Sequence, residues 1–368
     1  MIDLIKLGKK LWPLNRSLTG RDNKKTLLIL KKEIPSLKIK YFKSGKKIFD
    51  WKIPSEWNVK DAYVLDKNNK KIISFKKNNL HLVSYSQKID ITLNRDQFLI
   101  KTFSKKNLKN AIPYVTSYYK KNWGFCLTYN QKKEILKNYS YKDKFKIIID
   151  SNFKKNGLMH YGEIYIPGKS KEEILITTYI CHPSMANNEL SGPLVTLAIA
   201  KHFEEKKNLK SIRILFIPET IGAIAYIHKN YDKLKKYVIG GYVVTCIGDD
   251  NNYSFLKTKY GNTISDKAAV MAFNKYKIKY KKYSFLKRGS DERQFNSPHV
   301  DLNLASIMRT KYGEYKEYHT SLDNFNLVTP KGLNGGYKVA REAIKNLDKI
   351  IMPKVNYLCE PQLGKRNL

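Results

Sequence analysis

The chain has 368 residues, 42% of them hydrophobic and 12% aromatic, which excludes a disordered protein and leaves room for one large or two ordinary domains. Its formal net charge is +38, but lysine far outnumbers arginine and the lysines are spread along the whole chain. Specific phosphate recognition favours the bidentate fork of arginine. The charge therefore indicates a solvated, lysine-rich surface more than a functional basic face, and a nucleic-acid partner is not favoured.

The cysteines and the N-terminal segment indicate the cellular compartment. Cys126, Cys181, Cys246 and Cys359 lie far apart without CxxC spacing, which argues against a zinc knuckle or a disulfide framework. The first residues lack the apolar core of a signal peptide, and no apolar run reaches the ~18 residues of a membrane span. We expect a reduced, cytoplasmic protein with no membrane partner.

The first 150 residues begin with helical spacing and then change to period two. A helix is predicted over 2–12, ended by Pro13, and a second helix runs up to Pro35. Alternating apolar and polar residues then predict strands at 38–42, 62–65, 72–75, 81–85, 144–150 and 161–166. Residues 45–150 are therefore interpreted as a β-rich unit inserted into the chain.

After Gly168 strands alternate with helices. The predicted strands are 173–180, 211–217, 239–246 and 302–308, and the predicted helices are 190–206, 220–230, 262–276 and 331–349. This pattern predicts an α/β fold with a doubly wound, mainly parallel sheet. We expect residues 1–44 and 151–356 to form one discontinuous α/β domain around the 45–150 insert, followed by a tail at 357–368.

Polar side chains stand where successive strands of this predicted sheet end. His182 follows the first strand, Glu219 the second, Asp249 and Asp250 the third, and His319 the loop after the last. Ligands of open α/β sheets bind at the carboxyl ends of the strands. Each residue alone also has an ordinary structural explanation, but imidazole nitrogen and carboxylate oxygen together are the ligands of a catalytic zinc ion, with a free glutamate as general base.

Several motifs carry a resemblance that covers nearly the whole chain. They are Asn15–Gly20, Phe49–Pro54, Ile112–Tyr119, Trp123–Cys126, Cys181–Ser184, Pro218–Gly222, Lys311–Tyr315 and His319–Asp323. The sequence resembles the DUF4910 family with its inserted DUF2172 β-domain, bacterial proteins often encoded among surface-polysaccharide genes. These proteins are similar to the co-catalytic zinc aminopeptidases of the M28 type, which implies a zinc-aminopeptidase (phosphorylase/hydrolase-like) fold.

The resemblance assigns roles residue by residue. His182 matches the first zinc-binding histidine, His319 the last one, and Glu219 the general base. The aspartate that bridges two zinc ions in the peptidases falls at Asn188, and an acid is displaced by one residue onto Glu189.

Two further ligand positions are altered. The metal-binding glutamate after the base is Thr220, and a further aspartate ligand falls at Thr245, with Asp249 and Asp250 nearby as the remaining candidates. An amide oxygen is a weaker zinc ligand than a carboxylate. The resemblance therefore implies one zinc ion rather than two, or an empty site.

Three hypotheses follow. The first is a metal-dependent hydrolase of an amide bond, in a small peptide or an N-acylated sugar precursor, acting in surface-polysaccharide biosynthesis. The alternative is an inactive, metal-poor protein that binds a glycan precursor on the same fold. The third is a nucleic-acid-associated protein, which is disfavoured because the chain stops where the winged-helix module of the family would begin.

Further residues are candidates for substrate contacts. Arg16 and Arg288 suit a substrate carboxylate or phosphate, and Asp291 and Tyr318 lie in the polar loops beside the predicted site. Aromatic residues of the insert suit the apolar faces of sugar rings, although core packing also explains them; they are His81, Tyr85, Tyr114, Tyr118, Tyr119 and Trp123. A homo-oligomer stays open.

Overall fold

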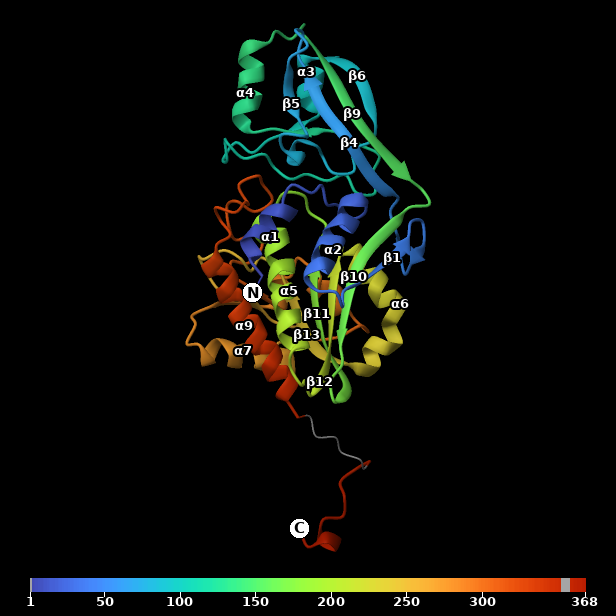
Figure 1. Cartoon of the computed structure of the whole chain (residues 1–368), viewed down its shortest axis with the longest axis vertical. Helices are drawn as coiled ribbons and strands as arrows, with labels where there is room; N and C mark the ends of the chain where they lie inside the picture. The colour runs from blue at the N-terminus through green and yellow to red at the C-terminus, as the bar shows by residue number, and fades with distance from the viewer. Residues whose placement is uncertain (1, 352–357) are drawn as a thin grey trace.

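The structure is a computed structural model that describes residues 2–351 and 358–368. Its larger part is built on an eight-stranded sheet (Figure 1). In spatial order the strands are β1 (Lys38–Lys43), β10 (Leu158–Ile166), β12 (Lys210–Ile217), β11 (Ser170–Tyr179), β13 (Val238–Val244), β16 (Leu304–Met308), β14 (Ser254–Leu256) and β15 (Lys281–Tyr283).

The four central strands, β12, β11, β13 and β16, are parallel. Their β-branched, apolar sequences suit strands that are covered on both faces. From β11 the chain moves to β12 on one side and then crosses to β13 on the other. The carboxyl ends of the strands at such a reversal are where α/β proteins bind ligands.

Helices cover both faces of the sheet, as the doubly wound pattern predicts. Side chains alternate along β11: Ile174 and Ile176 pack into one apolar core, while Leu175 and Tyr179 pack into the other. The first core includes α1 (Leu4–Leu11), α2 (Arg21–Glu33), α5 (Ser191–Glu204), α7 (Ile264–Lys275) and α9 (Pro330–Lys349). The second core includes α6 (Ile221–Tyr237) and α8 (Glu292–Phe295).

A four-stranded antiparallel sheet stands beyond the amino-terminal helices, at the top of Figure 1. Its order is β5 (Lys71–Ser74), β4 (Glu56–Leu65), β9 (Lys144–Lys154) and β6 (Ile89–Asn94). Its apolar face joins the same core as α6, and β9 leads through a short turn into β10 of the large sheet. The shorter elements are β2 (Lys47–Ile48), β3 (Trp51–Lys52), η1 (Asn79–His81), α3 (Arg95–Ile100), β7 (Thr102–Phe103), β8 (Phe125–Cys126), α4 (Tyr129–Asn138), the π-helical turn η2 (Ala186–Leu190), η3 (Phe285–Lys287) and η4 (Gly364–Arg366).

The predicted strands and helices of the α/β part are confirmed, with instructive differences. The helix predicted to end at 230 continues to Tyr237, because the chain becomes helical again after a kink at Asn230 (φ −124°, ψ 16°). The strand predicted at 81–85 is wrong: that segment forms only isolated bridges at Leu82 and Ser84, and Tyr85 has a positive φ of 67°. The boundary expected between 356 and 357 lies outside the described residues, and the 45–150 division stays a prediction.

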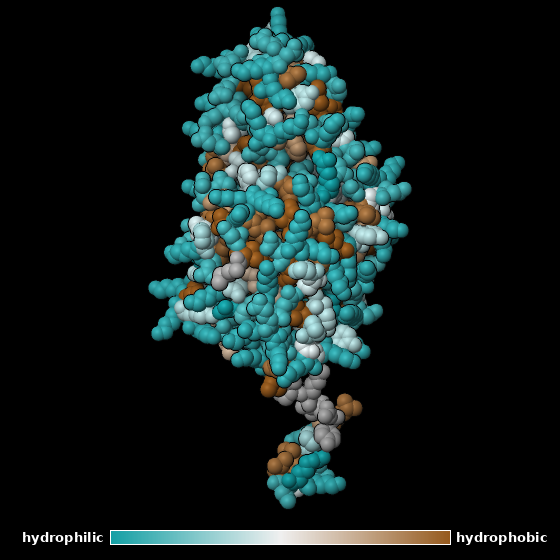
Figure 2. All heavy atoms as spheres, in the orientation of Figure 1, coloured by the Kyte–Doolittle hydropathy of each residue, from teal (hydrophilic) through white to brown (hydrophobic). Residues whose placement is uncertain are grey.

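The surface agrees with the composition. The face in Figure 2 is covered mainly by hydrophilic side chains, with smaller apolar areas between them. Among residues 2–351 and 358–368, no helix is long and apolar enough to cross a membrane.

Candidate active site

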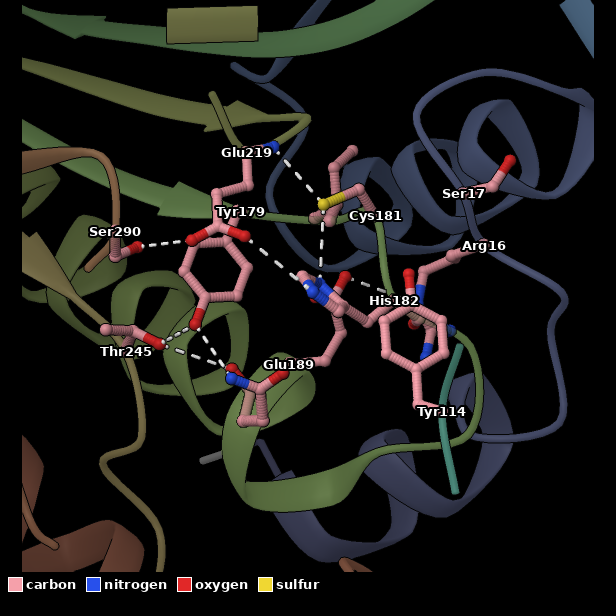
Figure 3. A network of polar contacts seen from close by, with 12 residues as sticks. Arg16, Ser17, Tyr114, Tyr179, Cys181, His182, Glu189, Glu219, Thr245 and Ser290 are labelled. Atoms are coloured by element: carbon pink, nitrogen blue, oxygen red, sulfur yellow. Dashed lines mark hydrogen bonds and ion pairs between the residues drawn. The ribbon is translucent and has the colours of Figure 1, made fainter. Parts of the chain in front are cut away.

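The candidate site lies at the carboxyl ends of β11 and β12. Cys181 and His182 follow β11 after Ile180, and Glu219 follows β12 after Pro218. The sulfur, nitrogen and oxygen atoms of these three residues lie within 4.8 Å of one another, and no other His, Cys, Asp and Glu cluster of this kind occurs in the described part of the chain. Figure 3 shows the three residues close together.

His182 is held by a carboxylate on one ring nitrogen and faces another carboxylate with the other. Its Nδ1 lies 2.8 Å from Oε2 of Glu189, and its Nε2 lies 3.7 Å from Oε2 of Glu219 (Figure 3). An ionised carboxylate only accepts hydrogen bonds, so Nδ1 is the donor to Glu189. Burial alone lowers the pKa of His182, but the hydrogen bond and charge of Glu189 outweigh it and raise that pKa.

Glu189 comes from the π-helical turn η2, which follows the loop after His182. Its side chain is fully buried, and Oε1 lies 3.6 Å from Nε of Arg16. Glu189 therefore contacts the imidazole nitrogen that points away from Glu219. The sequence predicted Glu189 as a direct metal ligand. Its position better suits a residue that orients a metal-binding histidine.

Arg16 lies behind the loop and has no exposed surface. Its Nε donates to the carbonyl oxygen of His182 at 3.1 Å, and Nη1 donates to the carbonyl oxygen of Leu11. Burial lowers the pKa of the guanidinium, which the charge of Glu189 partly offsets. The structure thus places Arg16 as a buried clamp on the His182 loop, which corrects the expectation that it binds a substrate anion.

Glu219 is positioned by two loops. Its Oε1 accepts a hydrogen bond from Oγ of Ser290 at 2.7 Å, and its backbone N–H donates to the sulfur of Cys181 at 3.2 Å. Asp291 accepts from the backbone N–H of Thr220 at 2.7 Å. Burial raises the pKa of Glu219, and burial together with the charge of Glu219 raises the pKa of Asp291 well above its ordinary value. Asp291 therefore binds the backbone next to the predicted base, Glu219.

His319 comes into the same site from the loop after β16. Its ring stacks on Tyr318, with 3.9 Å between the centroids, and lies 5.3 Å from the ring of His182. Its Nε2 is buried and has no hydrogen-bond partner within the described residues. Burial lowers the pKa of His319 to about 2, so the imidazole is neutral and can offer a lone pair. Tyr318 contacts the ring of His319 by stacking on it.

Asn188 stands at the position of the bridging aspartate. Its Nδ2 donates to the hydroxyl of Tyr179 at 3.0 Å, and that hydroxyl also accepts from Thr245 (Figure 3 shows Tyr179 and Thr245). Its Oδ1 is buried without a partner in the part of the chain that the structure describes. An unpaired buried oxygen is a feature that demands an explanation, and a bound cation provides one.

Three of the predicted site residues are not brought to this centre. Asp249 accepts from Oγ1 of Thr310 at 2.6 Å, and Asp250 pairs with Nη2 of Arg309 at 2.9 Å. Both acids belong to the next loop, where their own partners satisfy them. Arg288 is exposed and packs on its neighbour Phe285, so the expected contact of Arg288 with a substrate finds no support in its position.

Asp323 ends the motif that begins at His319, and the sequence alone predicted no role for it. Its carboxylate accepts hydrogen bonds from three successive backbone N–H groups, those of Ala186, Asn187 and Asn188. It thereby fixes the turn that carries Asn188 and Glu189. The short spacing from His319 to Asp323 was the signal available in the sequence.

Aromatic rings connect the centre to the surface. Tyr114 lies 5.1 Å from the ring of His182 and shares a 2.7 Å hydrogen bond with the hydroxyl of Tyr118. The next residue, Tyr119, is 55% exposed and contacts the 38% exposed ring of Trp51. The other expected rim residues, which are His81, Tyr85 and Trp123, are buried and belong to the core.

The donor types present fit a zinc ion, since zinc binds imidazole nitrogen. Nε2 of His182 faces Oε2 of Glu219 at 3.7 Å. Nε2 of His319 and Oδ1 of Asn188 are additional buried atoms without partners in the described chain. Glu189 is bound to His182, and the positions that the resemblance gives to further acid ligands hold Thr220 and Thr245.

The sheet order and the site define an M28-type, aminopeptidase-like α/β fold. The chain belongs to the family described as a domain of unknown function, DUF4910, whose model matches residues 5–350.

A Clostridium acetobutylicum protein named for polysaccharide biosynthesis and an aminopeptidase-like domain is 42% identical over 367 residues, covering 100% of this chain and 82% of the relative. A crystal structure of a protein described as a peptidase from Clostridium acetobutylicum is 42% identical, with a TM-score of 0.90 over 99% of this chain and 84% of that one. The zinc aminopeptidase BSAP from Bacillus subtilis has a TM-score of 0.69 at 13% identity, covering 95% of this chain and 94% of that one. This last likeness concerns the fold.

Proposed function

We propose that the protein hydrolyses an amide bond with the help of one zinc ion. The observation that carries the proposal is the orientation of His182, whose Nδ1 is bound by Glu189 while Nε2 faces Glu219 at 3.7 Å. Metal-binding histidines are commonly oriented in this way by a carboxylate on the second nitrogen. The unpartnered Nε2 of His319 and Oδ1 of Asn188 support the same centre.

The residues that would hold zinc are His182, His319 and Asn188, with Glu219 beside them. When bound, the ion supplies Lewis-acid polarisation of the scissile carbonyl. Glu219 is the general base that takes a proton from the attacking water. Burial raises its pKa and so brings it closer to the neutral range in which a general base works best. Ser290, which donates to Oε1, leaves Oε2 directed at His182.

The substrate we propose is a small peptide or an N-acylated sugar precursor of surface-polysaccharide biosynthesis. The printed name of the Clostridium acetobutylicum relative and the aromatic residues from Tyr114 to Trp51 support this choice. Aromatic faces suit the C–H faces of a sugar ring.

A second candidate function is a metal-poor protein that binds the same precursor without catalysis. Two observations favour it: an amide stands at Asn188 where the peptidases use a carboxylate, and the guanidinium of Arg16 lies 3.6 Å from Glu189. A buried guanidinium behind the site weakens the attraction of the site for a second cation.

Zinc content separates the two functions. We expect zinc-loaded protein to retain about one equivalent after gel filtration and each of His182→Ala and His319→Ala to retain less than about 0.1. Glu219→Gln should keep zinc and lose turnover of an aminoacyl or N-acetyl-hexosamine panel by about a hundredfold or more. Zinc-free wild-type protein that still binds the precursor would establish the second function, and full turnover by Glu219→Gln would exclude that residue as the base.

A further inference from the structure

A cavity opens beyond the loop that carries Asp249 and Asp250. It has a volume of about 650 Å³ and lies between the Asp250–Tyr253 segment, strand β15 and the start of α9. Asp249 points toward Asn187 in the first site, whereas its neighbour Asp250 lines this cavity. The volume falls within the range of about 300–1,000 Å³ that is typical of small-molecule sites.

Arg309 forms the buried wall of the cavity. Its side chain is 4% exposed, its Nε donates to the carbonyl oxygen of Asn252 at 2.8 Å, and its guanidinium lies 3.7 Å from the ring centroid of Tyr253. These contacts fix the plane of the guanidinium. A pre-oriented arginine fork is the group that best matches the oxygens of a phosphate.

One guanidinium nitrogen of Arg309 stays available. Nη2 donates to Asp250, but Nη1 has no hydrogen-bond partner among the described residues. Nη1 lies beside Gly335, and both Arg309 and Gly335 line the cavity. Gly335 makes this possible, because a Cβ there would lie 2.4 Å from Nη1.

The charge of the lining favours an anion. Four cations line the cavity, Arg309, Lys279, Lys281 and Lys331, against the single acid Asp250. Asp250 pairs with Arg309 and with Nζ of Lys331 at 2.8 Å, which leaves both Lys279 and Lys281 without a described carboxylate partner. Helix α9 begins at this wall, and its N-terminal end adds partial positive charge.

Aromatic rings in the same cavity can take a flat group. Tyr253 is covered by Arg309, and Tyr280 is held by stacking on Phe273 with 4.1 Å between centroids. We propose that this cavity binds a diphosphate group, either free or as part of a nucleoside diphosphate, with Arg309 and Lys281 on the phosphate oxygens and the tyrosines beside a base.

Strand β15 provides a matched pair of variants. Lys281 and Lys282 are adjacent and exposed, but only Lys281 lines the cavity, since successive side chains of a strand point to opposite faces. The test is calorimetric titration of the full-length protein at low salt with uridine diphosphate, inorganic pyrophosphate and uridine.

We expect both phosphate probes to bind, with Lys281→Glu raising the Kd about tenfold or more and Lys282→Glu changing it less than about twofold at the same ionic strength. Arg309→Lys, which keeps the charge but removes the fork, should also raise the Kd about tenfold. Uridine diphosphate that binds tighter than pyrophosphate identifies a nucleotide as the ligand, and equal affinities identify free diphosphate. The proposal is overturned if neither phosphate probe binds wild-type protein, if uridine alone binds as tightly, or if both lysine variants lose affinity equally. Because Lys281 and Lys282 are exposed, their variants decide the matter even if Arg309→Lys does not fold.

Discussion

Glu189 and His182 are joined by a hydrogen bond of 2.8 Å, and the bond determines which imidazole nitrogen is free. A carboxylate on Nδ1 requires the proton there, so in the neutral imidazole the lone pair lies on Nε2, the nitrogen that faces Glu219. Glu189 stands one position after Asn188, which occupies the place of the bridging aspartate. Glu189 thus contacts His182 at Nδ1, the nitrogen that points away from Glu219.

Replacement of Glu189 by glutamine should weaken zinc binding. The amide can donate to Nδ1, which moves the ring proton to Nε2 and blocks the lone pair. We expect about a 10- to 100-fold loss of zinc affinity in calorimetric titration. Glu134→Gln, on the exposed face of α4, is the control and should bind zinc as the wild type does. Unchanged affinity in Glu189→Gln would show that Glu189 does not orient His182.

Asp323→Asn should destabilise the protein and disturb the site together. The carboxylate receives the N–H groups of Ala186, Asn187 and Asn188, and an amide cannot accept all three at the same oxygens. We expect a loss of about 2–4 kcal/mol in the free energy of unfolding, measured by urea titration, because buried N–H groups lose their partners. Asp232→Asn on the exposed side of α6 should change it by less than about 0.5 kcal/mol. Equal stability of the two variants would contradict this role.

Glu163 should control stability in acid. It is 6% exposed and bonds to Lys40, Arg213 and the hydroxyl of Tyr226. Burial alone raises its pKa, but these partners together lower it below the unfolded value. A lowered folded pKa means that the stabilisation is complete above about pH 4.3, the unfolded value, and is lost as the pH falls through the folded pKa.

Glu163→Gln tests this dependence. At pH 7 the variant should lose about 3 kcal/mol, since Arg213 keeps only part of its buried partners. Between pH 5 and 2 its urea midpoint should fall less steeply than that of the wild type. Asp90→Asn, which removes an exposed pair with Lys146, is the control and should follow the wild-type slope. Parallel slopes for Glu163→Gln and the wild type would refute the assignment.

Trp51→Ala should reduce affinity for a sugar-containing substrate if the Trp51–Tyr119 pair is its platform. Both rings are exposed and lie 5.8 Å apart at 69°. We expect KM to rise about fivefold to tenfold with kcat nearly unchanged, because the contact is the same in the ground and transition states. Tyr260→Ala, at a site 58% exposed, is the control. A fall in kcat without a change in KM would contradict a binding role.

The sequence predicted the parts of this structure that depend on local pattern. The β-branched run before His182 predicted β11, and the residues after each strand predicted that His182, Glu219 and His319 share an edge; the structure brings these three together. The sequence did not predict β15, because Lys-Lys-Tyr has no apolar alternation. The prediction that Arg16 binds a substrate anion was wrong, because Arg16 is buried behind the His182 loop. The contact of Arg16 with His182 joins residues 166 positions apart, and no local pattern encodes such a pair.

That separation affects how the protein is made. The partner carbonyl of Arg16, at His182, is synthesised 166 residues after it. At translation rates of about 5–20 residues per second, the arginine waits roughly 8–33 s before the buried contact can form. During this time its guanidinium stays in water, and closure of so long a loop delays ordering of the His182 segment. The segment around Arg16 therefore lacks this buried contact until the strand that precedes His182 has been completed.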